Sequence, residues 1–246
     1  MKKIYVVGIG PGNEEYMTIQ AKETIEQADV ICGYTVYVDL VRNLAEGKEI
    51  YAKGMMKEKD RCQWAVDTAA EGKTVALVCS GDSGVYGMAS LVFELAQDTP
   101  EVEIEVVPGI SAVLSGGAVL GAPVAHDFCV VSLSDHLTEW SLIEKRIRLG
   151  GEADFIMAMY NPKSKKRPEY INRACEILME VKSPETVCGW VRNIGREGQE
   201  YGICTLKELP DQPIDMFTTV FIGSSKTVNM NGKMVTPRGY IEKYGK

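Results

Sequence analysis

The sequence predicts an α/β protein built from two α/β domains, an N-terminal one with a mostly parallel sheet and a C-terminal one with a mixed sheet. Three observations predict this class. Short apolar runs alternate with helical patterns in the first half of the chain, three of these runs end in glycine-rich loops, and the alternation starts again after the break Gly121-Ala122-Pro123. We place the domain boundary at that break, which gives domains of residues 1–121 and 122–246.

The first domain is predicted from runs that alternate regularly. A strand at residues 4–7 is followed by apolar residues spaced three or four apart, which predict a helix, and then by a strand at 30–32. Because helices separate the strands, we expect the strands to be parallel. The later elements, in order, are a helix at 60–71, a strand at 74–79, a helix at 85–97, a strand at 104–107 and a helix that begins at Ser111.

The second domain combines the same alternation with a different ending. Its last two apolar runs, at 203–206 and 217–222, have no long helix between them, and we expect them to pair antiparallel, which makes the sheet mixed. The elements before them are a strand at 129–132, a helix at 142–149, a strand at 155–159, a helix after Pro168 and a strand at 186–191.

Composition and charge exclude several classes of protein. A chain of 246 residues with 45% apolar residues is long enough to bury substantial cores. The formal net charge of −7 argues against nonspecific nucleic-acid binding, which needs many cations on one face, although a local basic patch remains open. Seven cysteines form no CxxC pair, and several lie in apolar runs, so we expect reduced core residues of a cytoplasmic protein.

Two stretches resemble targeting or membrane segments, and both are interpreted otherwise. The apolar run at the start of the chain is interrupted by glycine at residue 8, too early for a signal peptide. Residues 106–125 carry no charge and have the length of a membrane span, but they contain four glycines and two prolines. We expect that stretch to form a loop, a buried helix and a linker, and we expect no membrane association.

Three glycine-rich loops follow predicted strands at residues 8–13, 80–87 and 108–112. Glycine lets main-chain atoms come close to a ligand, and loops at the carboxyl ends of parallel strands meet at one edge of the sheet. The first loop departs from the dinucleotide fingerprint, because Asn13 stands where a third glycine is needed and Asp29 precedes the second apolar run instead of ending it. The loops therefore predict a ligand site of another kind.

Together, the ordered signatures GxGPG, GDxxxYG and PGISA resemble those of the tetrapyrrole methylases. This resemblance implies two α/β domains with an active-site cleft between them, S-adenosyl-L-methionine as methyl donor and S-adenosyl-L-homocysteine as product. Asp82 and Ser111 also suit a second interpretation, as helix caps. The residues that the resemblance places around the donor are Pro11, Ser80, Gly81, Asp82, Val85, Ser111, Ala112, Tyr160 and Asn161.

Cationic loops in the second half predict a carboxylated substrate. Residues 160–167 contain four cations, and the segments 192–199 and 236–240 each place an arginine beside glycine. Arginine binds carboxylates with two parallel hydrogen bonds, so these loops suit a macrocycle rimmed with acetate and propionate arms; a solvated loop is the alternative. The candidates for substrate binding are Lys163, Arg167, Arg192, Arg196 and Arg238.

Further segments narrow the resemblance to the precorrin-3B C(17)-methyltransferases, which include the cobalt-factor III methyltransferases. The segments are SLSDxLTxW, YNPxSxxR, RNxGREGQ, MFTTVxIGxSxT and TPRGY, and the chain departs from the family pattern at His136 and Glu139. The resemblance implies methylation of carbon 17 with ring contraction, giving precorrin-4 or cobalt-precorrin-4 in cobalamin biosynthesis. Whether the substrate is the cobalt-containing or the metal-free macrocycle stays open, and any cobalt arrives within the substrate.

Ring contraction requires proton transfers, and the candidates for them are Asp82, Asp135, His126 and Glu197. None of them is favoured over the others, and His126 also suits a structural role after the linker. The other histidine, His136, is expected at the surface. With two histidines ten residues apart and no clustered thiols, we expect no metal site in the protein.

Two other functions remain open at this point. One is a methylase of the same fold that acts on a different precorrin, on RNA or on a modified histidine of a protein, and the other is a non-catalytic tetrapyrrole or nucleoside sensor. An RNA enzyme should carry a broad basic surface, which the isolated arginine loops do not predict. The family resemblance also implies a homodimer.

Overall fold

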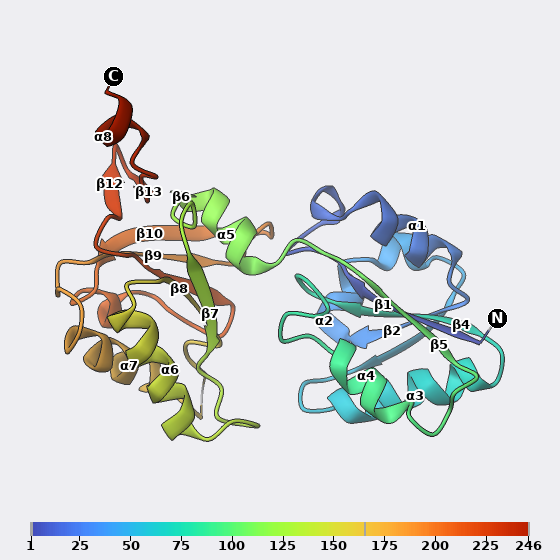
Figure 1. The fold of residues 1–246 in the computed structure, drawn as a ribbon. Helices are drawn as coiled ribbons and strands as arrows, with labels where there is room; N and C mark the ends of the chain where they lie inside the picture. Colours follow the sequence, from blue (N-terminus) through green and yellow to red (C-terminus); the bar gives the residue numbers. More distant parts are fainter. Residues whose placement is uncertain (1, 165, 246) are drawn as a thin grey trace. The chain divides into compact units, whose positions relative to one another are not determined.

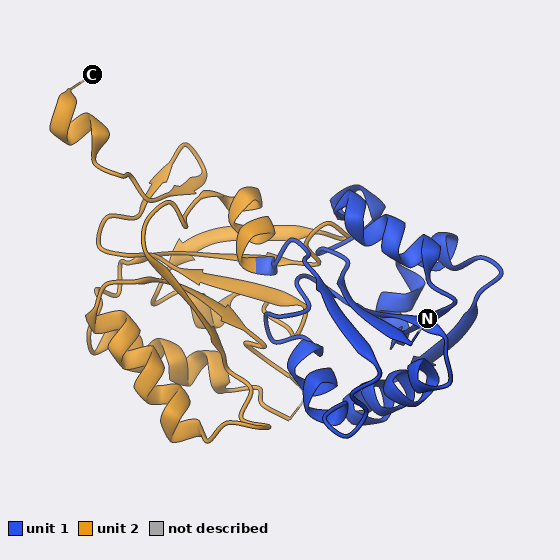
Figure 2. Cartoon of the chain, turned by 45° about the vertical axis from the view of Figure 1, so that its right-hand side comes forward, with its two compact units in different colours: residues 1–112 blue, residues 113–246 orange. Residues whose placement is uncertain are grey.

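A computed structural model describes residues 2–164 and 166–245. The chain divides into two compact units, Met1–Ala112 (unit 1) and Val113–Lys246 (unit 2), which Figure 2 shows in blue and orange. Helix α5 (Ala112–Leu120) starts at this division, whereas the sequence placed it at the end of the first domain. It belongs with unit 2 because a side chain at Gly116 would lie against Ile194 and Phe221 of that unit.

Unit 1 is a five-stranded sheet of order β3-β2-β4-β1-β5 in which every pairing is parallel, as the alternation predicted (Figure 1). Alternate residues of β4 enter different cores: Val75 and Leu77 pack with α3 and α4, and Ala76 and Val78 pack with α1 and α2. The elements are β1 Lys3–Gly8, α1 Ile19–Gln27, β2 Val30–Tyr34, α2 Thr35–Asp39, β3 Glu49–Lys53, α3 Glu58–Ala70, β4 Thr74–Cys79, α4 Ala89–Leu95 and β5 Glu103–Val107, with short 3-10 helices at Glu14–Tyr16 and Arg42–Ala45.

Two details of unit 1 differ from the sequence expectation. The edge strand β3 was not expected; it is mostly exposed, so its residues carry no apolar alternation. Helix α4 begins at Ala89 and not near residue 85, because the preceding segment stays in a loop where Tyr86 has a φ of 54°. That loop is one of the three glycine-rich segments.

Unit 2 contains a mixed sheet of order β10-β9-β11-β8-β7 and a small sheet of order β12-β13-β6. Helices α6 and α7 pack on one face of the mixed sheet, and α5 lies against Phe221 and Gly189 of that sheet. The elements after α5 are β6 Gly121–Ala122, β7 Phe128–Ser132, α6 Trp140–Glu152, β8 Ile156–Tyr160, α7 Tyr170–Met179, β9 Val187–Arg192, β10 Glu200–Thr205, a 3-10 helix Leu209–Asp211, β11 Thr218–Ile222, β12 Val228–Met230, β13 Lys233–Val235 and α8 Tyr240–Tyr244.

The mixed character of this sheet is confirmed, but the expected pairing of its last two long strands is wrong. Strands β10 and β11 do not pair with each other; each pairs antiparallel with β9, which lies between them. Strand β11 also pairs antiparallel with β8, while β7 and β8 are parallel. Because each is antiparallel to β9, β10 and β11 run in the same direction; the absence of a helix between them in the sequence carried no information on an earlier strand that inserts between the two.

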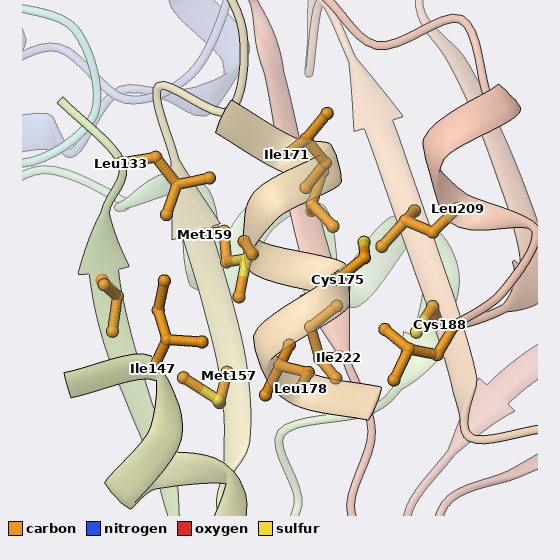
Figure 3. Close-up of a cluster of buried hydrophobic side chains, with 14 of the residues drawn as sticks. Leu133, Ile147, Met157, Met159, Ile171, Cys175, Leu178, Cys188, Leu209 and Ile222 are labelled. Atoms are coloured by element: carbon orange, nitrogen blue, oxygen red, sulfur yellow. The ribbon is translucent and has the colours of Figure 1, made fainter. Parts of the chain in front are cut away.

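The core of unit 2 explains several cysteines. Cys175 of α7 and Cys188 of β9 lie with Met157, Met159 and Ile222 in one buried cluster (Figure 3). All seven cysteines are free, and the prediction of core positions is confirmed for the five buried ones, Cys32, Cys62, Cys79, Cys175 and Cys188. Burial in apolar surroundings raises the pKa of the Cys175 thiol to about 12. None of the helices in the described ranges has the length and apolar character needed to cross a membrane.

Candidate active site

The three glycine-rich loops of unit 1 follow the carboxyl ends of β1, β4 and β5, which are neighbours in the sheet. The first two loops are joined by a reciprocal pair of main-chain hydrogen bonds: Gly10 N donates to Gly81 O at 3.1 Å, and Gly81 N donates to Gly10 O at 2.7 Å. Such pairing extends the sheet contact beyond the strands. The expectation that loops far apart in sequence meet at one edge therefore holds for these two.

Asp82 links the second loop to the third. Its carboxylate accepts hydrogen bonds from Gly84 N at 2.8 Å and from Gly109 N at 3.0 Å. The buried hydroxyl of Ser83 donates to Val6 O at 2.9 Å, which ties the same loop to β1. Since both oxygens of Asp82 accept main-chain hydrogen bonds within the loops, this geometry makes Asp82 a tether between them.

The approach of these loops leaves no room for side chains at two glycines. A Cβ atom on Gly109 would lie 2.2 Å from Gly81 O, and one on Gly8 would lie 2.7 Å from Gly109 N. Both contacts are with main-chain atoms, which cannot move aside as a flexible side chain can. The residues assigned to the donor in this unit, which are Pro11, Ser80, Gly81, Asp82, Val85, Ser111 and Ala112, thus lie on one tightly joined edge.

The remaining candidates lie in unit 2, mostly at one edge of its mixed sheet. Strands β7 and β8 are parallel, and β8 and β9 run in the same direction because each is antiparallel to β11. Their carboxyl ends are Ser132, Tyr160 and Arg192, and the loops that follow contain most of the predicted site residues. We call this the carboxyl edge of unit 2.

Tyr160 and Asn161, which the resemblance assigned to the donor, hold this edge together. The phenol oxygen of Tyr160 accepts a hydrogen bond from Val113 N at 2.7 Å, and its carbonyl accepts one from Leu133 N at 2.9 Å. Asn161 has a φ of 53° and donates from Nδ2 to Ser132 Oγ at 2.9 Å. Asparagine tolerates this left-handed conformation better than most residues, which explains its place at the turn.

Arg167 and Asp135 form an ion pair between the loops after β8 and β7. Arg167 donates from Nε to Asp135 Oδ1, and the Tyr170 hydroxyl donates to Asp135 Oδ2. The hydrogen bond from Tyr170, followed by the one from Arg167, holds the pKa of Asp135 below its usual range. The carboxylate, in turn, raises the pKa of the Tyr170 phenol.

Arg192, at the end of β9, lies close to two acidic residues, Glu200 of β10 and Asp215 of the loop before β11. Its Nη2 lies 2.7 Å from Glu200 Oε2, and its Nη1 lies 4.0 Å from Asp215 Oδ2. Two other candidates, Lys163 and Arg196, are half-buried in loops of the same edge. Lys165, one of the four cations of the loop 160–167, lies outside the described residues.

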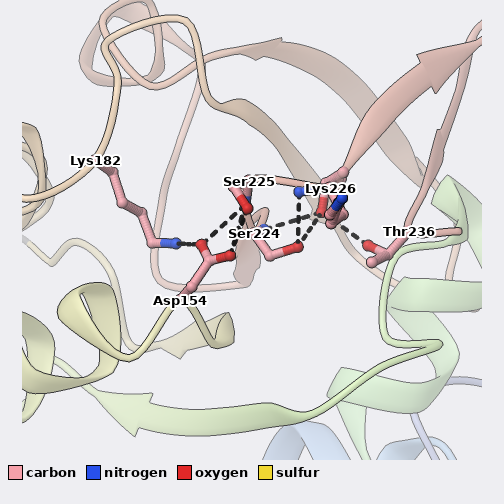
Figure 4. A network of polar contacts seen from close by, with 7 residues as sticks. Asp154, Lys182, Ser224, Ser225, Lys226 and Thr236 are labelled. Atoms are coloured by element: carbon pink, nitrogen blue, oxygen red, sulfur yellow. Dashed lines mark hydrogen bonds and ion pairs between the residues drawn. The ribbon is translucent and has the colours of Figure 1, made fainter. Parts of the chain in front are cut away.

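His126 and Arg238 lie elsewhere in unit 2. His126 precedes β7, whereas Asp135 follows it, so five residues of strand, about 17 Å, separate them. The end where His126 lies also carries the hydrogen-bond network in which Asp154 binds Lys182 and Ser225 (Figure 4). His126 lines a cavity of about 220 Å³ there with Lys226 and Thr236. Arg238 is exposed and comes two residues after Thr236, so it does not join the cations of the carboxyl edge.

The four candidates for proton transfer are therefore not one group. Within unit 2, His126 lies at the opposite edge of the sheet from Asp135 and Glu197, and it is exposed, as are His136 and Glu197. His126 and Asp135 are close in the sequence but far apart in space, because strand β7 runs between them from one edge of the sheet to the other. Among the described residues, no three His, Cys, Asp or Glu side chains gather as metal ligands.

Sequence reasoning missed the partners of the two central arginines, Tyr170 for the Arg167 pair and Glu200 for Arg192. One signal was present: Tyr170 stands three residues after Arg167, at the start of a helix. The indole of Trp140, the last residue of the SLSDxLTxW segment, packs on Tyr170 with ring centroids 4.3 Å apart.

Comparison with known proteins places the fold and these loops in one family. Residues 3–210 match the family described as Tetrapyrrole (Corrin/Porphyrin) Methylases. The chain belongs to the tetrapyrrole methylases. Members of this family use S-adenosyl-L-methionine as methyl donor, so the expected fold class and donor class agree with this membership.

Among individual tetrapyrrole methylases, the chain is 47% identical over 98% of its length to the cobalt-factor III methyltransferase of Priestia megaterium, of which it spans 46%. It is 43% identical over 96% of its length to a probable cobalt-factor III C(17)-methyltransferase of Salmonella typhimurium, of which it spans 98%. The crystal structure of the methyltransferase CobJ matches with a TM-score of 0.89 and 38% identity, covering 95% of this chain and 99% of that one.

Proposed function

We propose that this tetrapyrrole methylase transfers a methyl group from S-adenosyl-L-methionine to carbon 17 of cobalt-factor III or precorrin-3B. The transfer is coupled to ring contraction and gives cobalt-precorrin-4 or precorrin-4 in cobalamin biosynthesis. The observation that carries this proposal is the 43% identity to the Salmonella typhimurium relative over 98% of that protein's length. The geometry of the two sheet edges supports it.

The edge of unit 1 suits the methyl donor. Its glycine loops present main-chain groups without obstructing side chains, and the apolar side chains of Val85 and Ile110 are exposed in the second and third loops. Such an edge fits a ligand with a polar amino-acid part and an apolar purine. When bound, the sulfonium supplies an activated methyl group: its carbon–sulfur bond breaks as the new carbon–carbon bond forms, and S-adenosyl-L-homocysteine remains.

The contribution of the chain is to bind the donor and the macrocycle, to orient them and to exclude water from them. Holding two reactants in line accounts for about 7–11 kcal/mol of barrier in well-oriented reactions, so methyl transfer itself needs no acid or base. The hydrogen-bonded glycine loops supply the rigidity that such alignment needs. The cations of the carboxyl edge of unit 2, Lys163, Arg167, Arg192 and Arg196, bind the carboxylate arms of the macrocycle.

A mass-spectrometric assay tests the reaction. The purified protein is incubated with S-adenosyl-L-methionine and either cobalt-factor III or precorrin-3B, and the products are examined for one added methyl group. We expect one macrocycle to be methylated and S-adenosyl-L-homocysteine to appear in equal amount. If neither macrocycle gains a methyl group while the donor still binds, the proposal is wrong and a non-catalytic sensor is favoured. A basic surface for RNA is not expected from a net charge of −7.

We propose further that the protein acts as a homodimer in the cytoplasm. Tyr240, Ile241 and Tyr244 of α8 expose most of their side chains, and Met230 of β12 is exposed as well. Exposed apolar side chains gathered on terminal elements suit a self-complementary interface. Sedimentation equilibrium should give twice the chain mass, and a monomer at assay concentration would contradict this part of the proposal.

A further inference from the structure

Asp135 connects Arg167, which we propose to bind the macrocycle, with Tyr170, a residue that has no role in the proposed methyl transfer. Both of its carboxylate oxygens are engaged, one by Arg167 Nε and the other by the Tyr170 hydroxyl. The three residues come from the loop after β7, the loop after β8 and the first position of α7. The arrangement therefore links two loops of the carboxyl edge to the beginning of a helix that packs on the core.

The ring of Tyr170 packs against the tilted indole of Trp140, which Arg173 also contacts. Its centroid lies 4.3 Å from that of Trp140, and the Arg173 guanidinium lies 4.3 Å from the centre of the Trp140 ring. Trp140 and Tyr170 are the first residues of α6 and α7. Contacts of this kind restrict the ring and so direct the phenol hydroxyl toward Asp135.

The pairing with Asp135 leaves part of the Arg167 guanidinium available. Asp135 binds at Nε, and among the residues that the structure describes it is the one side chain that forms a hydrogen bond or an ion pair with this guanidinium. The side chain of Arg167 is 26% exposed. The edge formed by its two Nη groups can therefore bind a second carboxylate with two parallel hydrogen bonds, which is the geometry that distinguishes arginine from lysine.

We propose that Tyr170 is a positioning residue, which acts through Asp135 to fix the guanidinium of Arg167 so that its free edge meets a carboxylate arm of the macrocycle. This inference rests on the proposed function and names the residues that set substrate affinity at that site. It also assigns Asp135 to holding Arg167, in place of the proton transfer suggested by the sequence. The low pKa of Asp135 agrees with a carboxylate that stays ionised while it holds a cation.

A double-mutant cycle tests this inference. Tyr170→Phe removes the hydroxyl and keeps the ring that packs on Trp140, so the fold should be preserved. We expect Tyr170→Phe to raise the KM for the macrocycle by about 3- to 10-fold with kcat nearly unchanged and to leave donor affinity, measured by calorimetry, unaltered. In the Arg167→Ala background, the same change should have no further effect, because the guanidinium that Tyr170 positions is gone.

A matched control is available in unit 1. Tyr51 also packs on a tryptophan, Trp64, with centroids 4.2 Å apart, and Tyr51→Phe should leave both kinetic constants unchanged. The inference is overturned if Tyr170→Phe leaves KM unchanged. It is also overturned if Tyr170→Phe raises KM by the same factor in the Arg167→Ala variant as in the unmodified protein, since Tyr170 would then act independently of Arg167.

Macrocycle binding is followed in the same proteins by fluorescence quenching of uroporphyrin III, a carboxylate-rimmed probe. This separates the two proposals. Absence of methyl transfer by the unmodified protein would contradict the proposed function alone, whereas a missing coupling between Tyr170 and Arg167 in probe binding would contradict this inference. Absence of probe binding to the unmodified protein would also count against the inference.

Discussion

The sheet edge of each unit that carries predicted site residues is built from different chemistry. In unit 1, main-chain groups of Gly10, Gly81 and Gly109 bind one another or the Asp82 carboxylate, and what matters is the absence of side-chain atoms. In unit 2, Arg167 and Arg192 bind carboxylates of the same unit, and what matters is the presence of charge. The first edge should therefore respond to added volume, and the second to changes of charge.

The largest effect is expected from adding one methyl group to the loops of unit 1. In Gly109→Ala, the new Cβ would lie 2.2 Å from Gly81 O, so the second and third loops must move apart. Overpacking against main-chain atoms costs about 3 kcal/mol, which corresponds to about 100-fold weaker donor binding. Calorimetric titration with S-adenosyl-L-homocysteine measures this loss.

Gly54→Ala is the matched control for that change, because a Cβ at Gly54 would meet no atom within 4 Å. Its donor affinity should equal that of the unmodified protein. If Gly109→Ala binds the donor as tightly as the unmodified protein does, the close approach of the loops is not needed for binding. The edge of unit 1 would then not be sensitive to added volume.

A smaller and different effect is expected from removing charge in unit 2. Arg167→Ala should raise the KM for the macrocycle by about 10-fold, in line with about 1.5 kcal/mol for a hydrogen bond to a charged group. Arg192→Ala should raise it by about 3-fold, because Nη2 of Arg192 is already bound to Glu200. Donor affinity should stay unchanged in both variants.

Arg148→Ala is the control for lost surface charge, since Arg148 pairs with Glu180 between α6 and the end of α7. Steady-state kinetics with the macrocycle and calorimetry with the donor separate the two effects. If Arg167→Ala weakens the binding of the donor and the binding of the macrocycle equally, Arg167 does not act on the macrocycle alone.

The two edges also differ in how far the sequence could predict them. The glycine loops were predictable because the backbone requirement is local and each loop directly follows an apolar run. The grouping of Arg167 with Asp135 was not, since it depends on strand order in a mixed sheet. For the same reason His126 and Asp135, nine residues apart, were both candidates for proton transfer although strand β7 separates them.

The fold shows a similar division. The parallel sheet of unit 1 was predicted in direction and in most of its strands, because buried parallel strands are continuous apolar runs. The exposed edge strand β3 and the hairpin of β12 and β13 lack such runs and were missed. In unit 2, the insertion of β9 between β10 and β11 depends on how all strands of the sheet pack together, and no local sequence pattern predicts it.

The smallest expected effect concerns pH, and it distinguishes the edges most cleanly. The folded protein lowers the pKa of Asp135, so its ion pair stabilises the fold fully above the ordinary aspartate value, near 3.9, and this contribution disappears as the pH falls through the lower folded value. The Tyr170 phenol, whose pKa is raised by the hydrogen bond to Asp135, does not titrate in this range. Asp135 is 32% exposed, which limits the contribution to less than about 1 kcal/mol.

Asp135→Asn should therefore lower the free energy of unfolding at pH 7, and the difference from the unmodified protein should shrink at about pH 3.5 and below. Urea unfolding at both pH values measures it. The unfolding penalty of Gly109→Ala should change less between the two pH values, because it arises mainly from overlap of the new Cβ with the uncharged carbonyl of Gly81. A difference for Asp135→Asn that persists undiminished in acid would mean that this side chain contributes by packing, and the carboxyl edge of unit 2 would then resemble the edge of unit 1.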